Sequence, residues 1–286
     1  MSRLTTTILC LLVANIMLGL ALLGVVYLQG SSSGTLRLAG TLDDGGYRLL
    51  IKGRYSRAEI ARVQRQVKER LDMLDEQFAY ARPDSAVSHL AMTPPFKLAL
   101  LSPALQDAIA HLYQAQKLSG GHFSPFESTP FTAWWLYQHQ CVSLVQRFTF
   151  PAQTMQKGLH FGDYFIPLMP VSLNIKALTE GLALDALARV MQDAHITAYR
   201  LEVNGSLRGQ GDHWRVALFG DSVESLEGRV AMHGTSRDGQ PLWVFAPTGI
   251  EAATQLDALT ALDAEAARQV AAEQGISLRL KPKVSP

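Results

Sequence analysis

The residues of this sequence best placed to do chemistry together stand in one short stretch, VSLNIKALTEGLALDALARV, residues 171–190. Lys176, Glu180 and Asp185 place an ammonium group and two carboxylates near the point where a strand pattern changes to a helix pattern. The apolar run Val171–Ile175 predicts a buried strand, and the apolar spacing from Leu178 onward predicts an amphipathic helix. The N-terminus of a helix favours an anion such as a phosphate, so this junction is a candidate cofactor site.

Two residues of the junction favour different interpretations. Gly181, in the predicted first turn, costs about 1 kcal/mol relative to alanine, so we expect another group to approach its backbone closely. Glu180 suits the positive end of the helix dipole but opposes an anionic ligand. From these residues alone, a phosphate site and a plain corner between strand and helix both remain open.

Other familiar arrangements of chemical groups are absent from the sequence. It contains no HExxH, no G-x-S-x-G, no P-loop and no GxGxxG after a strand. Cys10 falls in an apolar run, so Cys141 stands alone in the rest of the chain, without a disulfide partner or a cysteine cluster for metal. No two histidines are spaced at i,i+4, and we interpret each as a surface or packing residue. They are His89, His111, His122, His139, His160, His195, His213 and His233.

Composition narrows the class of protein. The chain has 286 residues, of which 48% are hydrophobic and 18% charged, enough for a substantial core. Its formal net charge is +1, and its Lys and Arg residues are scattered, which argues against a nucleic-acid partner.

The N-terminal region predicts a membrane anchor. Ile8–Leu28 is an uncharged run, long enough to cross a hydrocarbon core of roughly 30 Å as a helix. Arg3 before this run favours a cytoplasmic N-terminus. The alternative to a membrane anchor is a cleaved signal peptide. We therefore expect an anchor or signal segment at 1–29, a linker at 30–36 and one domain at 37–282. The predicted location is the bacterial inner membrane, single-pass, with the body in the periplasm.

The first half of the body predicts a hairpin and two helices. Residues 35–53 contain two strand patterns around a DDGG turn. In residues 56–81, Ser56 and Glu59 form a capping box ahead of an apolar stripe with helical spacing. A second helix starts at Pro103 with Ser102 as its N-cap, and Gly120 ends it. Residues 138–165 are less regular, with short strands such as 146–150.

The second half predicts mostly strands, with a late helix. Residues 198–220 alternate around an Asn-Gly turn, and 229–236 and 241–249 are further strands. Residues 263–275 form a helix stopped by Gly275, and 276–281 form a closing strand. Helices and strands are mixed without regular βαβ alternation, so the predicted class is α+β.

The order of several motifs resembles the FAD:protein FMN transferase family, the ApbE-type flavin transferases. RLDMLDEQFAYARPDSAVSHL is similar to the family's helix and its S-x-Y-x-x-D-S motif, and SGGHFSPFESTPFTAWW to T-G-G-A-F-D-P-T. VSLNIKALTEGLALD is similar to L-D-L-x-x-I-A-K-G-x-A-x-D, PLWVFAPTG to H-I-I-D-P-x-T-G, and QLDALTAL to A-D-A-L-A-T. The resemblance runs from about Leu38 to about Leu280 and implies a single ApbE-like, T-fold-like ectodomain behind one transmembrane helix.

The resemblance also implies a chemistry. Members of the family bind FAD with Mg²⁺ and transfer FMN to a Thr or Ser hydroxyl of a partner, such as a membrane redox subunit. Magnesium prefers oxygen ligands, and the motifs assign these to Ala177, Asp257 and Thr260. The remaining matched positions are expected to bind the cofactor, and none is assigned a catalytic role. They are Tyr80, His122, Phe123, Ser124, Asn174 and Glu180.

This chain keeps the Gly, Pro and apolar residues of the motifs, Gly181 among them, and it also keeps Asp185, but it differs at most of their other charged positions. Ser124 and Asn174 stand where the motifs have Asp, and Glu180 stands where they have Lys. The positions of the motifs' His and Asp in H-I-I-D-P carry Trp243 and Ala246, and the Glu of G-G-E is replaced by Ser206.

Such a combination of losses predicts that the transferase activity is weak or lost. The alternative is a non-catalytic accessory or flavin-binding protein, a pseudoenzyme, of a membrane redox or assembly complex. An unrelated extracytoplasmic α+β module is the third interpretation.

Overall fold

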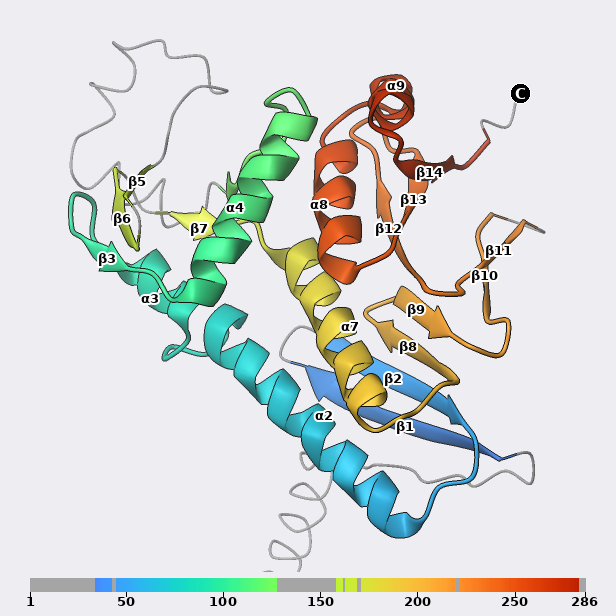
Figure 1. Ribbon diagram of the computed structural model, residues 1–286. Coiled ribbons are helices and arrows are strands. Elements are labelled where there is room, and N and C mark those ends of the chain that lie inside the picture. The colour runs from blue at the N-terminus through green and yellow to red at the C-terminus, as the bar shows by residue number, and fades with distance from the viewer. Residues whose placement is uncertain are drawn as a thin grey trace, which may run out of the picture.

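The computed structural model describes residues 34–42, 45–127, 158–161, 163–168, 171–219 and 222–282. Its main feature is a seven-stranded antiparallel sheet in the order β1-β2-β8-β9-β12-β13-β14 (Figure 1). The strands are β1 (Thr35–Leu42), β2 (Gly45–Lys52), β8 (Tyr199–Val203), β9 (Ser206–Gln210), β12 (Arg229–Thr235), β13 (Pro241–Ala246) and β14 (Ser277–Leu280). Helices pack on this sheet, which confirms a mixed α and β fold.

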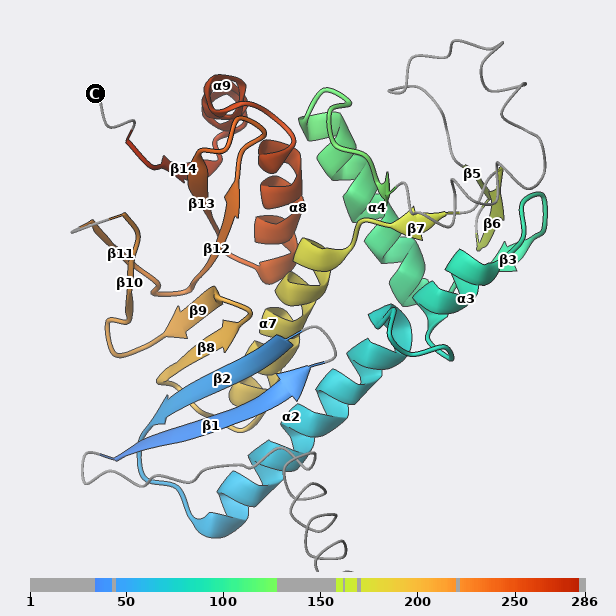
Figure 2. The ribbon, with the colours of Figure 1, turned by 180° about the vertical axis from the view of Figure 1, so that it is seen from behind.

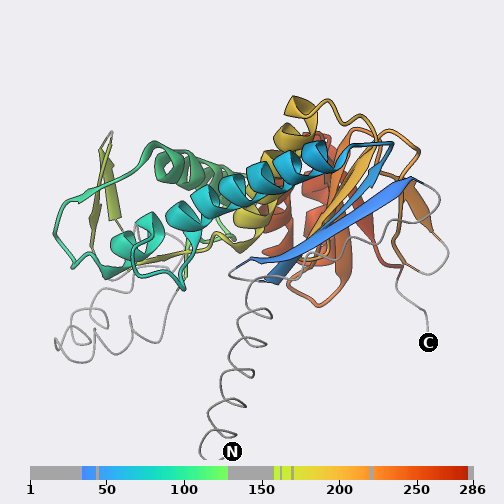
Figure 3. The ribbon, with the colours of Figure 1, turned by 90° about the horizontal axis from the view of Figure 1, so that it is seen from below.

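Long helices cover one face of the sheet. Seen from behind, β1, β2, β8 and β9 lie in front of α2 (Arg57–Phe78) and α7 (Lys176–Asp193), as Figure 2 shows. The helix α8 (Gly249–Thr260) lies beside α7, and α4 (Pro103–Leu118) packs against α8. The view from below shows these helices on one side of the strands (Figure 3). The layer between sheet and helices holds the main hydrophobic core.

Local signals place the ends of these helices. Ser56 and Glu59 form the predicted capping box at the start of α2. Ser102 caps α4, whose first residue is Pro103, and α4 ends at Leu118, just before Gly120. The helix α9 (Ala264–Gln274) ends at Gly275, which has the left-handed φ of 68° that favours glycine. These predictions are confirmed.

Two helices were not predicted. The short helix α3 (Ala86–Met92) starts after Ser85, whose side chain accepts a hydrogen bond from the Ser88 N–H. The helix α8 follows β13 directly, with Thr248 as its N-cap. Its sequence is mostly apolar, and its apolar residues do not show a clear helical period. The reason is that the sheet, α7 and α4 together bury most of the helix surface.

Small sheets lie beyond the far end of α2. The strands β3 (Ala99–Leu100), β6 (Tyr164–Pro167) and β5 (Gly158–Phe161) form one of them, next to α3. Another pairs β4 (Phe126–Glu127) with β7 (Ser172–Leu173), and so holds the loop after α4 against the segment before α7. The predicted strand at 146–150 lies outside the described residues.

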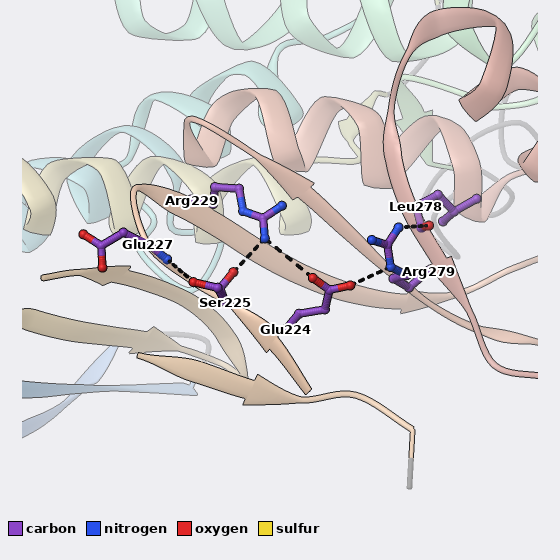
Figure 4. Close-up of polar contacts among 6 residues, drawn as sticks. All are labelled: Glu224, Ser225, Glu227, Arg229, Leu278 and Arg279. Carbon is purple, nitrogen blue, oxygen red and sulfur yellow. Dashed lines mark hydrogen bonds and ion pairs between the residues drawn. The ribbon is translucent and has the colours of Figure 1, made fainter. Parts of the chain in front are cut away.

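A hairpin covers the other face of the main sheet. It consists of β10 (Arg215–Ala217) and β11 (Val223–Ser225), and with Trp214 and Leu226 it packs over Leu207 and Phe245. The Glu224 carboxylate lies between two guanidinium groups, 2.7 Å from Nε of Arg279 and 3.7 Å from Nη2 of Arg229 (Figure 4). These contacts connect the hairpin to β12 and β14.

Within the described part of the chain, no helix has both the length and the apolar character needed to cross a membrane. The predicted anchor Ile8–Leu28 lies outside the described residues, so it stays a prediction.

Candidate functional site

The strand–helix junction differs in detail from the prediction. The strand β7 is limited to Ser172 and Leu173, and α7 begins at Lys176, two residues before Leu178. The predicted strand ends early because Ile175, with ψ of 5°, is no longer extended and takes the N-cap position. It provides no side-chain cap to the first turn.

Gly181 lies in the second turn of α7, and its backbone is indeed approached closely, by another helix. A Cβ on Gly181 would stand 2.2 Å from the carbonyl oxygen of Gly249, and one on Gly249 would stand 2.0 Å from the oxygen of Gly181. Only glycine at both positions permits this contact. It sets α7 and α8 side by side, so that the N-terminal turns of α7 face the C-terminal half of α8.

Asp185 fixes the same pair of helices through hydrogen bonds. Its carboxylate accepts from the backbone N–H groups of Gly249, at 2.8 Å, and Ile250, at 3.1 Å, which are the first two of α8. It also pairs with Arg208 of β9 at 2.6 Å, and both side chains are almost completely buried. Asp185 therefore acts as a support for α8 and lies outside the cavities described next.

A cavity of about 730 Å³ opens where α7, α8, the loop after α4 and the end of β12 meet. We call it the α7–α8 cleft. It brings together all the predicted site residues except Tyr80, although they come from distant parts of the chain: His122, Phe123, Ser124, Asn174, Ala177, Glu180, Asp257 and Thr260. Its lining also includes Lys176 of the strand–helix junction, and residues that were not predicted: Phe126, His233, Leu256 and Ala261.

Tyr80 lines a neighbouring cavity of about 280 Å³, which we call the apolar pocket. Leu71, Phe78 and Ile175 are among its mostly apolar lining. The Tyr80 hydroxyl accepts from the Leu173 N–H at 2.6 Å and lies 3.2 Å from the Leu173 carbonyl oxygen, to which it donates. Lys176 and Glu180 line both cavities, so the cleft and the pocket meet at the first turns of α7.

Asp257 has unusual electrostatics. Its side chain is 8% exposed, and among the described residues its carboxylate has no hydrogen-bond or ion-pair partner. Burial, followed by the negative charge of Glu180, raises the pKa of Asp257 to about 8. Below about pH 8 the Asp257 carboxyl group therefore holds its proton, and a nearby positive charge would favour its ionised form.

Oxygen atoms of other groups lie around the same cleft. Glu180 accepts from the Ser206 hydroxyl at 2.9 Å and from the Asn204 amide at 3.5 Å. The Thr260 hydroxyl donates to the Leu256 carbonyl oxygen at 2.9 Å, which leaves its oxygen lone pairs available. In the described part of the chain, no three His, Cys, Asp or Glu residues gather as a metal cluster. Any cation here would therefore take hydroxyl and backbone oxygens beside Asp257, a ligand set that suits Mg²⁺.

Lys176 gives the cleft a positive group. It is the first residue of α7, it is exposed, and within the described residues its ammonium has no hydrogen-bond or ion-pair partner. It stands one helical turn before Glu180, on the same side of the helix. The motifs' lysine position is thus occupied by a carboxylate, while an ammonium lies one turn earlier.

His233 lines the α7–α8 cleft, a placement that the sequence did not indicate. It is exposed and its ring packs on Trp243, which agrees with its interpretation as a surface or packing histidine. The strand pairing places it directly opposite Trp243, the position at which the motifs have their histidine. Only the register between β12 and β13 reveals this relation, and no spacing within the sequence indicates it.

Comparisons with known proteins relate this chain to one family. The sequence pattern of the ApbE family matches residues 46–237. A curated FAD:protein FMN transferase from Klebsiella pneumoniae (strain 342) is 30% identical over an alignment of 161 positions, and the match covers 43% of this chain. That match spans about half the relative's own length, 45%.

Solved structures share the fold. The flavinyl transferase ApbE from Pseudomonas stutzeri, in its apo form, has a TM-score of 0.69 at 17% identity, over 88% of this chain and 94% of that chain. The flavin transferase ApbE from Vibrio cholerae has a TM-score of 0.70 at 14% identity, over 87% and 94%. The family match over residues 46–237, which is more than half of the chain, shows that the chain belongs to the ApbE family, and the solved structures share its fold.

Proposed function

We propose that this chain is an FAD:protein FMN transferase that cleaves the pyrophosphate of FAD and attaches FMN to a Thr or Ser hydroxyl of a partner protein. The observation that carries the proposal is the meeting of two unlike cavities at the N-terminus of α7. FAD has two aromatic ring systems joined by a charged pyrophosphate. An apolar pocket next to a polar cleft suits such a ligand.

The pyrophosphate has a suitable place at the junction of the two cavities. The first turn of α7 has no side-chain cap, and Lys176 adds its ammonium there. Backbone N–H groups and a cation favour a phosphate at this point. Glu180 is held by Ser206 and Asn204, which offsets part of its repulsion of the ligand.

Mg²⁺ is the proposed cofactor, with Asp257, the Thr260 hydroxyl and the Ala177 carbonyl oxygen as its ligands. When bound, it would neutralise charge on the pyrophosphate and favour departure of the AMP group. The buried, unpartnered carboxylate of Asp257 supports this assignment. The ligand set has a single carboxylate, and the phosphate oxygens would complete it.

The partner and the location are part of the same proposal. The apolar run Ile8–Leu28 would hold the body at the periplasmic side of the inner membrane. A hydroxyl on a membrane redox subunit would then meet the open side of the cleft. The short linker after Leu28 limits the distance over which the body could act.

The test is a transfer assay with the purified protein. Detergent-solubilised membrane proteins of the cell that makes this chain are mixed with FAD and Mg²⁺, and flavin fluorescence is read in a denaturing gel. A fluorescent protein band that forms with the wild type, and disappears with EDTA or with Asp257→Asn, is the expected result. Binding of FAD without any labelled band would instead indicate a non-catalytic flavin-binding protein.

A further inference from the structure

His233 is held at the rim of the cleft by close packing between β12 and α8. A Cβ on the next residue, Gly234, would stand only 2.8 Å from Cγ2 of Thr260. The strand therefore lies directly against the last turn of α8 at this point. His233 is exposed there and lines the same cavity as Asp257 and Thr260.

Two neighbours fix the imidazole ring. Its centroid lies 5.1 Å from that of the Trp243 ring, at an interplanar angle of 34°. Its Cε1 occupies the space beside Gly205, where a Cβ would come within 2.7 Å. Any larger residue at position 205 would displace the imidazole ring. The glycine in the turn between β8 and β9 therefore leaves space for the ring of His233.

The ring nitrogens of His233 are available for chemistry. Among the described residues, neither has a hydrogen-bond or ion-pair partner. A positioned ring with two unused nitrogens, at the open side of a cavity, is arranged as a proton acceptor for a group that arrives from solvent.

We propose that His233 is the general base of the transfer reaction and that it accepts the proton of the acceptor hydroxyl. This inference rests on the proposed function and names a residue for it. The position opposite Trp243 allows a histidine on β12 to act where the family's motifs place a histidine on β13. Directly opposite residues of neighbouring strands have their Cβ atoms about 5 Å apart, within the reach of an imidazole ring.

The hydroxyl oxygen of the acceptor Thr or Ser forms a bond to the phosphorus of the FMN half of FAD. The bond from that phosphorus to the bridging oxygen breaks, and AMP leaves with the electron pair. The hydroxyl proton passes to a ring nitrogen of His233 and then to solvent. No oxidant or reductant takes part.

The test compares His233→Ala and His233→Phe with wild type in the transfer assay, using the same membrane-protein preparation. Rates are read as AMP released, and FAD affinity is measured by titration calorimetry. Phenylalanine keeps a ring against Trp243 but accepts no proton, so it separates packing from proton transfer. His89→Ala, on the exposed side of α3, is the matched control.

We expect both His233 variants to lose at least about 100-fold in rate. Their FAD affinity should stay within threefold of wild type, and added imidazole should restore part of the rate of His233→Ala. His89→Ala should match wild type. Near-normal transfer by His233→Phe, or a loss explained by weaker FAD binding, would overturn the role of His233 alone. Absence of transfer by the wild type would overturn the proposed function and this role together.

Discussion

Gly181 and Gly249 meet backbone to backbone where α7 crosses α8, close enough that a Cβ on either would overlap the other's carbonyl oxygen. This contact sets the spacing of the two helices. It thereby decides how far Glu180, next to Gly181, lies from Asp257, two turns along α8 from Gly249. The cleft depends on the absence of two side chains as much as on the groups that line it.

Gly181→Ala should destabilise the protein. The added methyl group meets a backbone oxygen, which yields less easily than a side chain, so we expect a loss of roughly 1–3 kcal/mol in the free energy of unfolding. Urea denaturation followed by circular dichroism measures it. Ala253→Gly in the same chain removes the nearest side chain, 3.1 Å from the new Cβ. This second change should not restore stability, and full rescue would show that the backbone contact is not the obstacle.

Breaking the buried pair of Asp185 and Arg208 should also be costly. Removing either partner leaves a buried charge uncompensated, and Asp185→Ala also removes the acceptor for the first N–H groups of α8. We expect about 3–5 kcal/mol from Arg208→Met or Asp185→Ala. The double variant should lose clearly less than the sum of the two, as a double-mutant cycle would measure. Simple additivity would contradict a coupled pair.

Stability should fall with rising pH because of Asp257. Its pKa is raised to about 8 in the folded protein, against about 4 in the unfolded chain. Between these values the native state holds a proton that the unfolded state lacks, so the free energy of unfolding decreases as pH rises and levels off above pH 8. Urea titrations in EDTA across this range measure the slope.

Two variants separate the causes of this slope. Asp257→Asn should remove the part of the slope that belongs to this group. Glu180→Gln should lower the pKa of Asp257, because it removes the neighbouring negative charge, and so should move the upper end of the slope to lower pH. An unchanged slope in Asp257→Asn would show that another group is responsible.

Lys176→Gln should weaken FAD binding without affecting stability. The side chain is exposed and, within the described residues, has no partner to lose. Loss of a charge-assisted contact to phosphate should raise the dissociation constant about 10-fold, or about 1.4 kcal/mol. Titration calorimetry with FAD measures this, with Lys97→Gln, in the loop between α3 and β3, as the control. Equal affinities of the two variants would place the pyrophosphate elsewhere.

The sequence predicted element types well where local signals are strong. The capping box of Ser56 and Glu59, the Ser102 cap and the left-handed Gly275 all depend on residues within one helical turn. The β8–β9 hairpin follows from its Asn204–Gly205 turn, in which both residues have positive φ. Prediction failed for α8, because a helix covered on several sides has no polar face to give a clear period.

The candidate site was predicted in part. Motif order led to Asn174, Ala177, Glu180, Asp257 and Thr260, and the structure gathers them around one cleft. The prediction that another group approaches the Gly181 backbone closely is confirmed. That group is the helix α8 rather than a ligand. The charge missing at one motif position is present one turn away in Lys176, which a position-by-position comparison does not detect.

The sequence by itself determined the order of elements, the motifs of the family and the residue types available for chemistry, because these depend on neighbours along the chain. Tertiary structure alone decided that His233 stands opposite Trp243, that Asp257 is buried without a partner, and that α7 and α8 touch through Gly181 and Gly249. The physical reason is that strand register, desolvation and helix spacing arise from contacts between residues far apart in sequence.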